Sequence, residues 1–189
     1  MSIGTEGQGP DLEQFRQYLM MLARLHWDQR LQDRMDVSDV VQQTLLEAHQ
    51  RLGQFRGTSD RELAGWLRTS LAHNLQDALK KVQGRQGDGP REALLLDAAL
   101  EESSSRLEAL LAADQSTPSA LADRNEQFAR LAAALDQLPP PQREAVMLHH
   151  LQGVSLADLA RRLDRTEASV AGLLRRGVKR LRELLREPE

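Results

Sequence analysis

Residues 155–170 read SLADLARRLDRTEASV. This stretch has the spacing of a helix-turn-helix. In that motif a small residue stands where two helices cross, a residue tolerant of left-handed backbone stands in the turn, and an apolar residue of the second helix points back into the core. Ala160, Asp164 and Val170 occupy these three positions. Asp replaces the commoner Gly in the turn at a modest cost, because Asp tolerates the left-handed conformation better than most residues.

The second helix of this pair, predicted over about residues 167–186, separates charged from apolar side chains. From Arg165 to Arg186 there are seven basic and two acidic residues, a local net charge of +5. On a helical wheel Arg175, Lys179 and Arg182 lie opposite the apolar face. Binding to phosphate requires such segregation. The alternative is a solvated amphipathic helix, which the turn spacing makes the weaker interpretation.

The composition of the whole chain favours an all-α fold. Its 189 residues include 34 Leu against one Ile and eight Val, so the β-branched residues that favour strands are scarce. The absence of Cys excludes a disulfide framework and Cys-ligated metal sites, and it fits a reducing, cytoplasmic compartment. The longest apolar stretch, residues 18–25, is too short to span a bilayer, so we expect no membrane partner. The net charge of −3 means that any attraction to nucleic acid must be local.

The N-terminal half predicts a small helical unit after a disordered stretch of ten residues. Its three amphipathic helices are expected over about residues 11–31, 36–52 and 61–82. Asp36 is placed to cap the second helix. The third helix is locally basic, and Trp66 falls between two leucines of its apolar stripe, which favours a core position over a stacking platform. The lone His73 is interpreted as a surface histidine.

The middle of the chain predicts an acidic linker. Residues 82–123 hold eight acidic groups against three Arg, and four helix breakers cluster between Gly84 and Pro90. Partial helix is expected over residues 91–113, but the serines at 103–105 argue against one continuous helix, and we expect no globular unit here. The predicted division of the chain is residues 1–10, 11–82, 83–118 and 119–189.

Little in the sequence points to an enzyme. His149 and His150 are adjacent, so on a helix they diverge by about 100° and cannot share a metal. There is no glycine-rich phosphate loop after a strand and no nucleophile elbow, and the carboxylates are scattered. We therefore expect no enzyme activity and no cofactor. Two binding functions are open: a stand-alone helix-turn-helix transcriptional regulator whose N-terminal helices bind a ligand or partner, and an all-helical adaptor that binds only protein.

Three stretches together resemble the extracytoplasmic-function sigma factors of bacterial RNA polymerase. Residues 36–48, DVSDVVQQTLLEA, look like the helix that docks on the clamp of the polymerase largest subunit. Residues 66–81, WLRTSLAHNLQDALKK, are similar to the promoter-opening helix that reads the minus-ten element. Residues 138–143, Gly153 and the two final helices look like the domain that reads the minus-thirty-five element. These stretches occur in the order that the family has.

The resemblance implies a factor that binds core RNA polymerase, directs it to promoter DNA and helps to open the duplex. It places Asp39, Gln42, Gln43 and Leu46 against the polymerase clamp. It places the loop Phe55–Arg61 around a base flipped from the non-template strand. The residues that it assigns to DNA, together with Lys179 from the helical wheel, are Arg56, Thr58, Arg61, Asn74, Asp77, Lys80, Lys81, Thr166, Ser169, Arg175 and Arg176. The linker is expected to thread toward the active-site cleft. An anti-sigma protein is an open question, and a monomer is expected when the chain is free.

Overall fold

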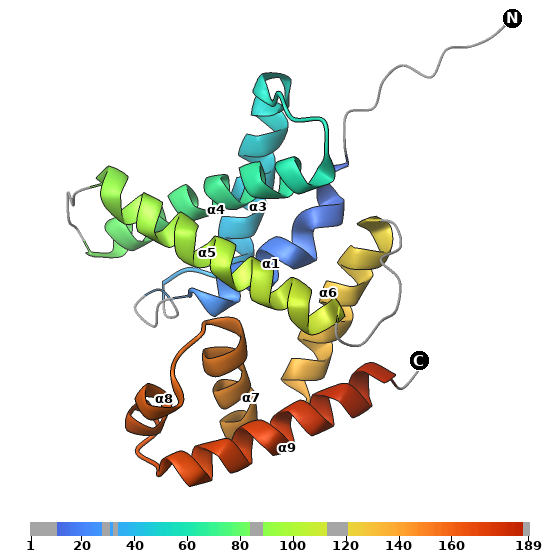
Figure 1. Cartoon of the computed structure of the whole chain (residues 1–189). Coiled ribbons are helices and arrows are strands. Elements are labelled where there is room, and N and C mark those ends of the chain that lie inside the picture. Colours follow the sequence, from blue (N-terminus) through green and yellow to red (C-terminus); the bar gives the residue numbers. More distant parts are fainter. Residues whose placement is uncertain (1–10, 28–30, 32–33, 84–88, 113–120, 187–189) are drawn as a thin grey trace, which may run out of the picture.

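The computed structural model describes residues 11–27, 31, 34–83, 89–112 and 121–186. Every regular element in this part of the chain is helical, which confirms the all-α prediction (Figure 1). Two elements are short 3-10 helices (η1 and η2) and one is a π-helical turn (η3). In chain order the elements are η1 (Leu12–Phe15), α1 (Arg16–Leu25), α3 (Val37–Arg51), η2 (Leu52–Gln54), α4 (Asp60–Gln83), α5 (Gly89–Ala112), α6 (Leu121–Asp136), α7 (Pro140–Val146), η3 (Met147–Leu151), α8 (Leu156–Arg162) and α9 (Glu167–Arg186).

The N-terminal helices pack through their predicted apolar faces, with one boundary shifted. The first helix was expected to reach about residue 31, but α1 ends at Leu25. The start of α3 is as predicted, because the Asp36 carboxylate accepts a hydrogen bond from the backbone N–H of Ser38 at 2.8 Å. α3 packs between α1 and α4. The buried residues of α3 are Val40, Val41, Thr44, Leu45 and Ala48.

The linker contains a continuous helix, α5, which corrects the prediction that its serines interrupt the helix. α5 runs unbroken from Gly89 to Ala112. Leu100 and Leu107 are fully buried, so this acidic segment contributes to the core instead of lying outside it. The serines fit because their hydroxyls have partners on α1: Ser104 hydrogen-bonds the Tyr18 hydroxyl at 2.9 Å, and Ser103 hydrogen-bonds the His26 ring at 2.9 Å. A buried hydroxyl is tolerated when it is paired in this way.

α5 lies against both ends of the chain. One part of it packs along α4, and it also contacts α1 and η3, so it connects the N-terminal helices with the C-terminal ones (Figure 1). The two groups of helices also touch directly. The Tyr18 and Phe128 rings pack with centroids 5.4 Å apart, and the Gln152 amide donates a hydrogen bond to the Leu25 carbonyl. The exact domain boundaries at residues 82 and 118 stay a prediction.

The C-terminal helices α6 to α9 form the predicted helix-turn-helix unit. Pro140 begins α7, where a proline costs nothing because the first N–H groups of a helix have no intrahelical partner. α9 crosses α7 closely at Gly177, where an added Cβ would lie 2.8 Å from the Val146 side chain. Ser155 caps α8 by accepting from the backbone N–H of Asp158 at 3.1 Å. α9 runs along one edge of the molecule in Figure 1.

Candidate nucleic-acid interface

The predicted polymerase-facing residues share one exposed stripe of α3. Asp39, Gln42, Gln43 and Leu46 are all exposed, and their spacing of three, four and seven places them on one helix face. Leu46 is 51% exposed. It is one of three large hydrophobic side chains that are exposed among the described residues, the others being Leu94 and Leu95. An apolar side chain exposed inside a polar stripe is typical of the centre of a protein interface.

The loop between η2 and α4, residues 55–59, is anchored by the packing of two aromatic rings. The Phe55 and Trp66 rings lie 5.5 Å apart between centroids, and both are partly buried against the core. This agrees with the core interpretation of Trp66. Arg56, Thr58 and Arg61, which the resemblance assigns to DNA, are exposed. The structure displays Arg56 and Thr58 on a loop whose aromatic side packs against the core, whereas Arg61, expected in the loop, lies in the first turn of α4.

Of the residues on the later turns of α4 that were predicted to contact DNA, some bond to other protein side chains and some are exposed. The Asn74 amide donates to the Thr44 hydroxyl at 3.1 Å and to the Glu47 carboxylate at 3.4 Å, so it ties α4 to α3. Lys80 pairs with Asp77 at 3.5 Å, one turn away, and Lys81 is exposed. Contact of these side chains with DNA stays a prediction, and Asn74 has a structural role that the sequence did not reveal.

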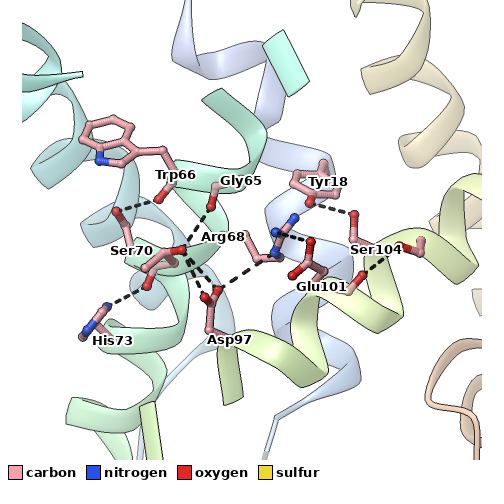
Figure 2. Close-up of polar contacts among 11 residues, drawn as sticks. Tyr18, Gly65, Trp66, Arg68, Ser70, His73, Asp97, Glu101 and Ser104 are labelled. Atoms are coloured by element: carbon pink, nitrogen blue, oxygen red, sulfur yellow. Dashed lines mark hydrogen bonds and ion pairs between the residues drawn. The ribbon is translucent and has the colours of Figure 1, made fainter. Parts of the chain in front are cut away.

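The opposite face of α4 is covered by acidic side chains of α5 (Figure 2). The Arg68 guanidinium lies 3.3 Å from the Glu101 carboxylate and 3.9 Å from that of Asp97, and its side chain is only 14% exposed. The Thr69 hydroxyl lies 3.2 Å from the Asp97 carboxylate. Sequence reasoning missed this network. The signal for it is the four-residue spacing of Asp97 and Glu101, which places both on one face of α5.

Near Arg68, the hydroxyl of Ser70 and the ring of His73 bond to backbone carbonyls of α4 itself. Ser70 donates to the carbonyl of Trp66 at 3.1 Å, and His73 Nδ1 lies 2.8 Å from the carbonyl of Thr69. His73 is exposed, which agrees with the interpretation of a surface histidine. These contacts, drawn in Figure 2, are local to the helix and add no ligand site.

The turn of the helix-turn-helix has the predicted geometry. Asp164 has a φ of +49°, the only positive φ of a non-glycine residue in the described chain, and Val170 is fully buried on the second helix. Thr166, assigned to DNA by the resemblance, has its hydroxyl engaged as the cap of α9: it accepts from the backbone N–H of Ser169 at 3.2 Å. That bond sets where α9 begins and so where its charges are presented.

The basic face of α9 is open. Arg175, Arg176 and Lys179 are exposed, and none of the three forms an ion pair within the described residues. A shallow groove between η3 and α9 is lined by His150, Leu174, Arg175, Val178, Lys179, Arg182, Glu183 and Arg186. Burial, then the neighbouring His149 and Arg182, lower the pKa of His150. The face is therefore an exposed cationic surface without competing protein carboxylates at the three named cations.

The described part of the chain holds no cluster of three His, Asp or Glu side chains suited to a metal ion. The His149 and His150 rings meet edge to face with centroids 5.0 Å apart, and His149 Nδ1 lies 2.7 Å from the Val154 carbonyl. Among the described helices, none combines the length and the apolar character needed to cross a membrane.

Comparison with known proteins gives two family matches. Residues 12–85 match Sigma-70 region 2, and residues 128–181 match Sigma-70, region 4. Over 176 residues the chain is 30% identical to the ECF RNA polymerase sigma factor SigM of Mycobacterium tuberculosis, covering 90% of this chain and 74% of that protein. It is 29% identical to SigX of Bacillus subtilis over 160 residues, covering 83% and 76%. It is 30% identical to BldN of Streptomyces coelicolor over 156 residues, covering 82% and 53%.

Proposed function

The chain belongs to the extracytoplasmic-function family of RNA polymerase sigma factors, and from this we propose how its surfaces divide the work of promoter recognition. As a sigma factor it directs RNA polymerase to particular promoters, and the family implies a binding protein instead of an enzyme. Core RNA polymerase and promoter DNA are its partners in that role.

The α3 stripe docks on the clamp of the polymerase largest subunit. Its support is the exposed Leu46 among Asp39, Gln42 and Gln43, since docking would remove that apolar side chain from water. The polar neighbours would form the hydrogen-bonded rim that interfaces of this kind have. This exposed stripe is the single observation that carries the docking proposal, because an apolar side chain within a polar stripe suits contact with a protein and not with DNA.

The two reading surfaces act on the two promoter elements. The open cationic face of α9 approaches the minus-thirty-five element through Arg175, Arg176 and Lys179, with Ser169 near the start of the helix. The loop Phe55–Arg61 holds a base flipped from the non-template strand, and Asp77, Lys80 and Lys81 lie along the upstream minus-ten DNA. Flipping a base costs a few kcal/mol. Docking on polymerase raises the effective concentration of both surfaces and so helps to offset that cost.

The linker threads toward the active-site cleft when the chain is bound, where its negative charge mimics nucleic acid. Because α5 packs on α4 and α1 in the structure, threading requires α5 to leave those helices. We further propose a monomer in the free state, a cytoplasmic location with the polymerase, and regulation by an anti-sigma protein that competes for the α3 stripe.

The test of polymerase dependence compares two exposed side chains. Leu46→Ala in the full chain should weaken binding to core polymerase about tenfold, because interface side chains at the centre of a patch contribute most of the affinity. Gln137→Ala is the control, since Gln137 is also exposed but lies just after α6, outside the surfaces proposed to contact polymerase or DNA. Binding is measured by titration against labelled core enzyme, followed by run-off transcription.

Two results would favour the competing functions. Specific binding of a promoter duplex by the isolated chain at physiological salt would favour a stand-alone regulator, since a small basic face alone should bind DNA weakly and with strong salt dependence. Association with another protein, but not with core polymerase or DNA, would favour an adaptor. Equal polymerase affinity in Leu46→Ala and the wild-type chain would remove the α3 stripe from the interface.

A further inference from the structure

The loop that precedes α4 is fixed by a single carboxylate. Glu62 Oε2 accepts hydrogen bonds from the backbone N–H groups of Thr58 at 2.9 Å and Ser59 at 3.0 Å, and from the Ser59 hydroxyl at 2.9 Å. In return the Ser59 hydroxyl accepts from the backbone N–H of Glu62 at 3.3 Å. The reciprocal Ser–Glu pair is a capping box, which satisfies free N–H groups at a helix start. Here the carboxylate also reaches one residue further back along the loop.

The base of the Glu62 side chain also helps to enclose the loop at Gly57. An added Cβ at Gly57 would lie 2.3 Å from the Phe55 ring and 2.9 Å from Glu62 Cβ. The loop backbone therefore passes between the Phe55 ring, itself packed on Trp66, and the Glu62 side chain. Any side chain at position 57 would force these groups apart. The loop thus has one tightly defined backbone path.

Glu62 is well suited to hold this path at neutral pH. The backbone N–H of Thr58, then the Ser59 hydroxyl and N–H, stabilise the ionised form and lower the pKa of Glu62. An ionised carboxylate only accepts hydrogen bonds, so all of its contacts with the loop are of one kind. The loop exposes Arg56 and Thr58, and the first turn of α4 exposes Arg61.

We propose that Glu62 is a positioning residue for promoter opening, whose carboxylate sets the loop geometry that discriminates the flipped base. This inference rests on the proposed role of the loop in holding that base. A base pocket discriminates only when its polar groups are held at fixed positions, because a mobile group can adapt to the wrong base as well as to the right one. Glu62 itself does not touch the DNA. It acts through the backbone of Thr58 and Ser59.

The test measures base preference and not only activity. Full-length variants are combined with core polymerase and assayed by run-off transcription on promoters that carry each of the four bases at each minus-ten position. The wild-type chain should show one position of strong preference. Glu62→Ala should reduce the preference there roughly tenfold, the size of one good base contact, and leave preferences at other positions unchanged. Glu62→Gln keeps an acceptor oxygen and should retain most of the preference.

The chain offers a matched control in its other capping box. Asp158 on α8 pairs with Ser155 as Glu62 pairs with Ser59, so Asp158→Ala removes a cap carboxylate far from the loop. Thermal melting should show similar small losses for Asp158→Ala and Glu62→Ala. Only Glu62→Ala should alter minus-ten base preference. If both variants alter it equally, or neither does, Glu62 acts only as a helix cap and the inference is overturned.

A double variant, Arg56→Ala with Arg61→Ala, separates this inference from the proposed function of the loop. If the double variant changes base preference and Glu62→Ala does not, only the positioning role fails. If neither changes it, the loop does not hold the base, and both proposals fall. Changed preference in both, with Asp158→Ala like the wild type, is the result that supports the inference.

Discussion

α4 and α9 are the two helices assigned to promoter DNA, and they differ in what covers their charged side chains. On α4 the Arg68 guanidinium is 14% exposed and lies between two carboxylates of α5. On α9, Arg175 and Lys179 are exposed and form no ion pair within the described residues. One helix is therefore a partly covered member of the core, and the other is an open cationic surface.

This difference separates stability from binding. Substitutions of α4 residues that face α5 should change folding first, because their partners are protein groups. Substitutions on the open face of α9 should change DNA affinity without changing folding, because these side chains are exposed and their proposed partner is phosphate. The helix proposed to read the minus-ten element is tied to the rest of the free chain, whereas the surface proposed for the minus-thirty-five element is exposed.

The largest effect is expected where α5 enters the core. Leu100 is fully buried on α5, so Leu100→Ala should lower the free energy of unfolding by about 2–5 kcal/mol. The measurement is urea unfolding of the full chain, monitored by circular dichroism. Leu94→Ala, 70% exposed on the same helix, should stay within about 0.5 kcal/mol of wild type. If both variants unfold like the wild type, α5 does not pack stably in the core, and α4 is then no more covered than α9.

The second effect concerns the open face. Arg175→Glu combined with Lys179→Glu should reduce promoter-specific transcription more than about tenfold, because phosphate contacts dominate DNA affinity. Urea unfolding should be unchanged, since both side chains are exposed. The charge-matched control is Arg34→Glu with Arg51→Glu, both exposed and outside the residues proposed to contact DNA or polymerase. An equal loss in the control would attribute the effect to net charge and not to α9.

The third prediction applies one substitution to both helices. Arg68→Met removes the cation between Asp97 and Glu101 and should cost about 1–2 kcal/mol of unfolding free energy, since it leaves the partly buried Asp97 carboxylate without its counter-charge, whereas Glu101 is exposed. Arg175→Met should leave unfolding unchanged and weaken promoter binding by the polymerase complex, with a shallower salt dependence. The reverse pattern, in which Arg175→Met destabilises and Arg68→Met does not, would contradict the contrast.

Local chemistry in the sequence was sufficient to predict much of this fold. The cap at Asp36 and the left-handed turn at Asp164 both depend on neighbours within a few residues, and both are present in the structure. The helix-turn-helix follows from these local rules together with the apolar spacing of its two helices. The four residues of the α3 stripe came instead from the family resemblance, and the helical period then places them on one face.

What the sequence could not show depends on partners far along the chain. Ser103 and Ser104 are polar and unfavourable in a helix when considered alone. In the structure their hydroxyls hydrogen-bond to His26 and Tyr18, at and near α1. Asn74 looked like a base-reading amide until its contacts with Thr44 and Glu47 were known. A one-dimensional pattern carries no information about such pairings. It therefore underestimated α5 and left the contact of Asn74 with DNA a prediction.

The smallest effect is a pH dependence on the covered side of the molecule. His26 is partly buried where α1 meets α5, and this burial lowers the pKa of its imidazole from the ordinary 6.5. Protonation therefore favours the unfolded chain, whose histidine keeps the ordinary value. The contribution of neutral His26 to stability is therefore complete above pH 6.5, the ordinary pKa. It is lost as the pH falls from there toward the lower pKa of the folded chain.

Urea unfolding midpoints at pH 7.5 and pH 5.5 measure this loss of stability. His26→Gln, which cannot be protonated, should show a smaller fall than the wild type, whereas His49→Gln on the exposed face of α3 should fall as the wild type does. If the wild type and both variants lose the same stability between the two pH values, the pH dependence arises elsewhere and not from His26.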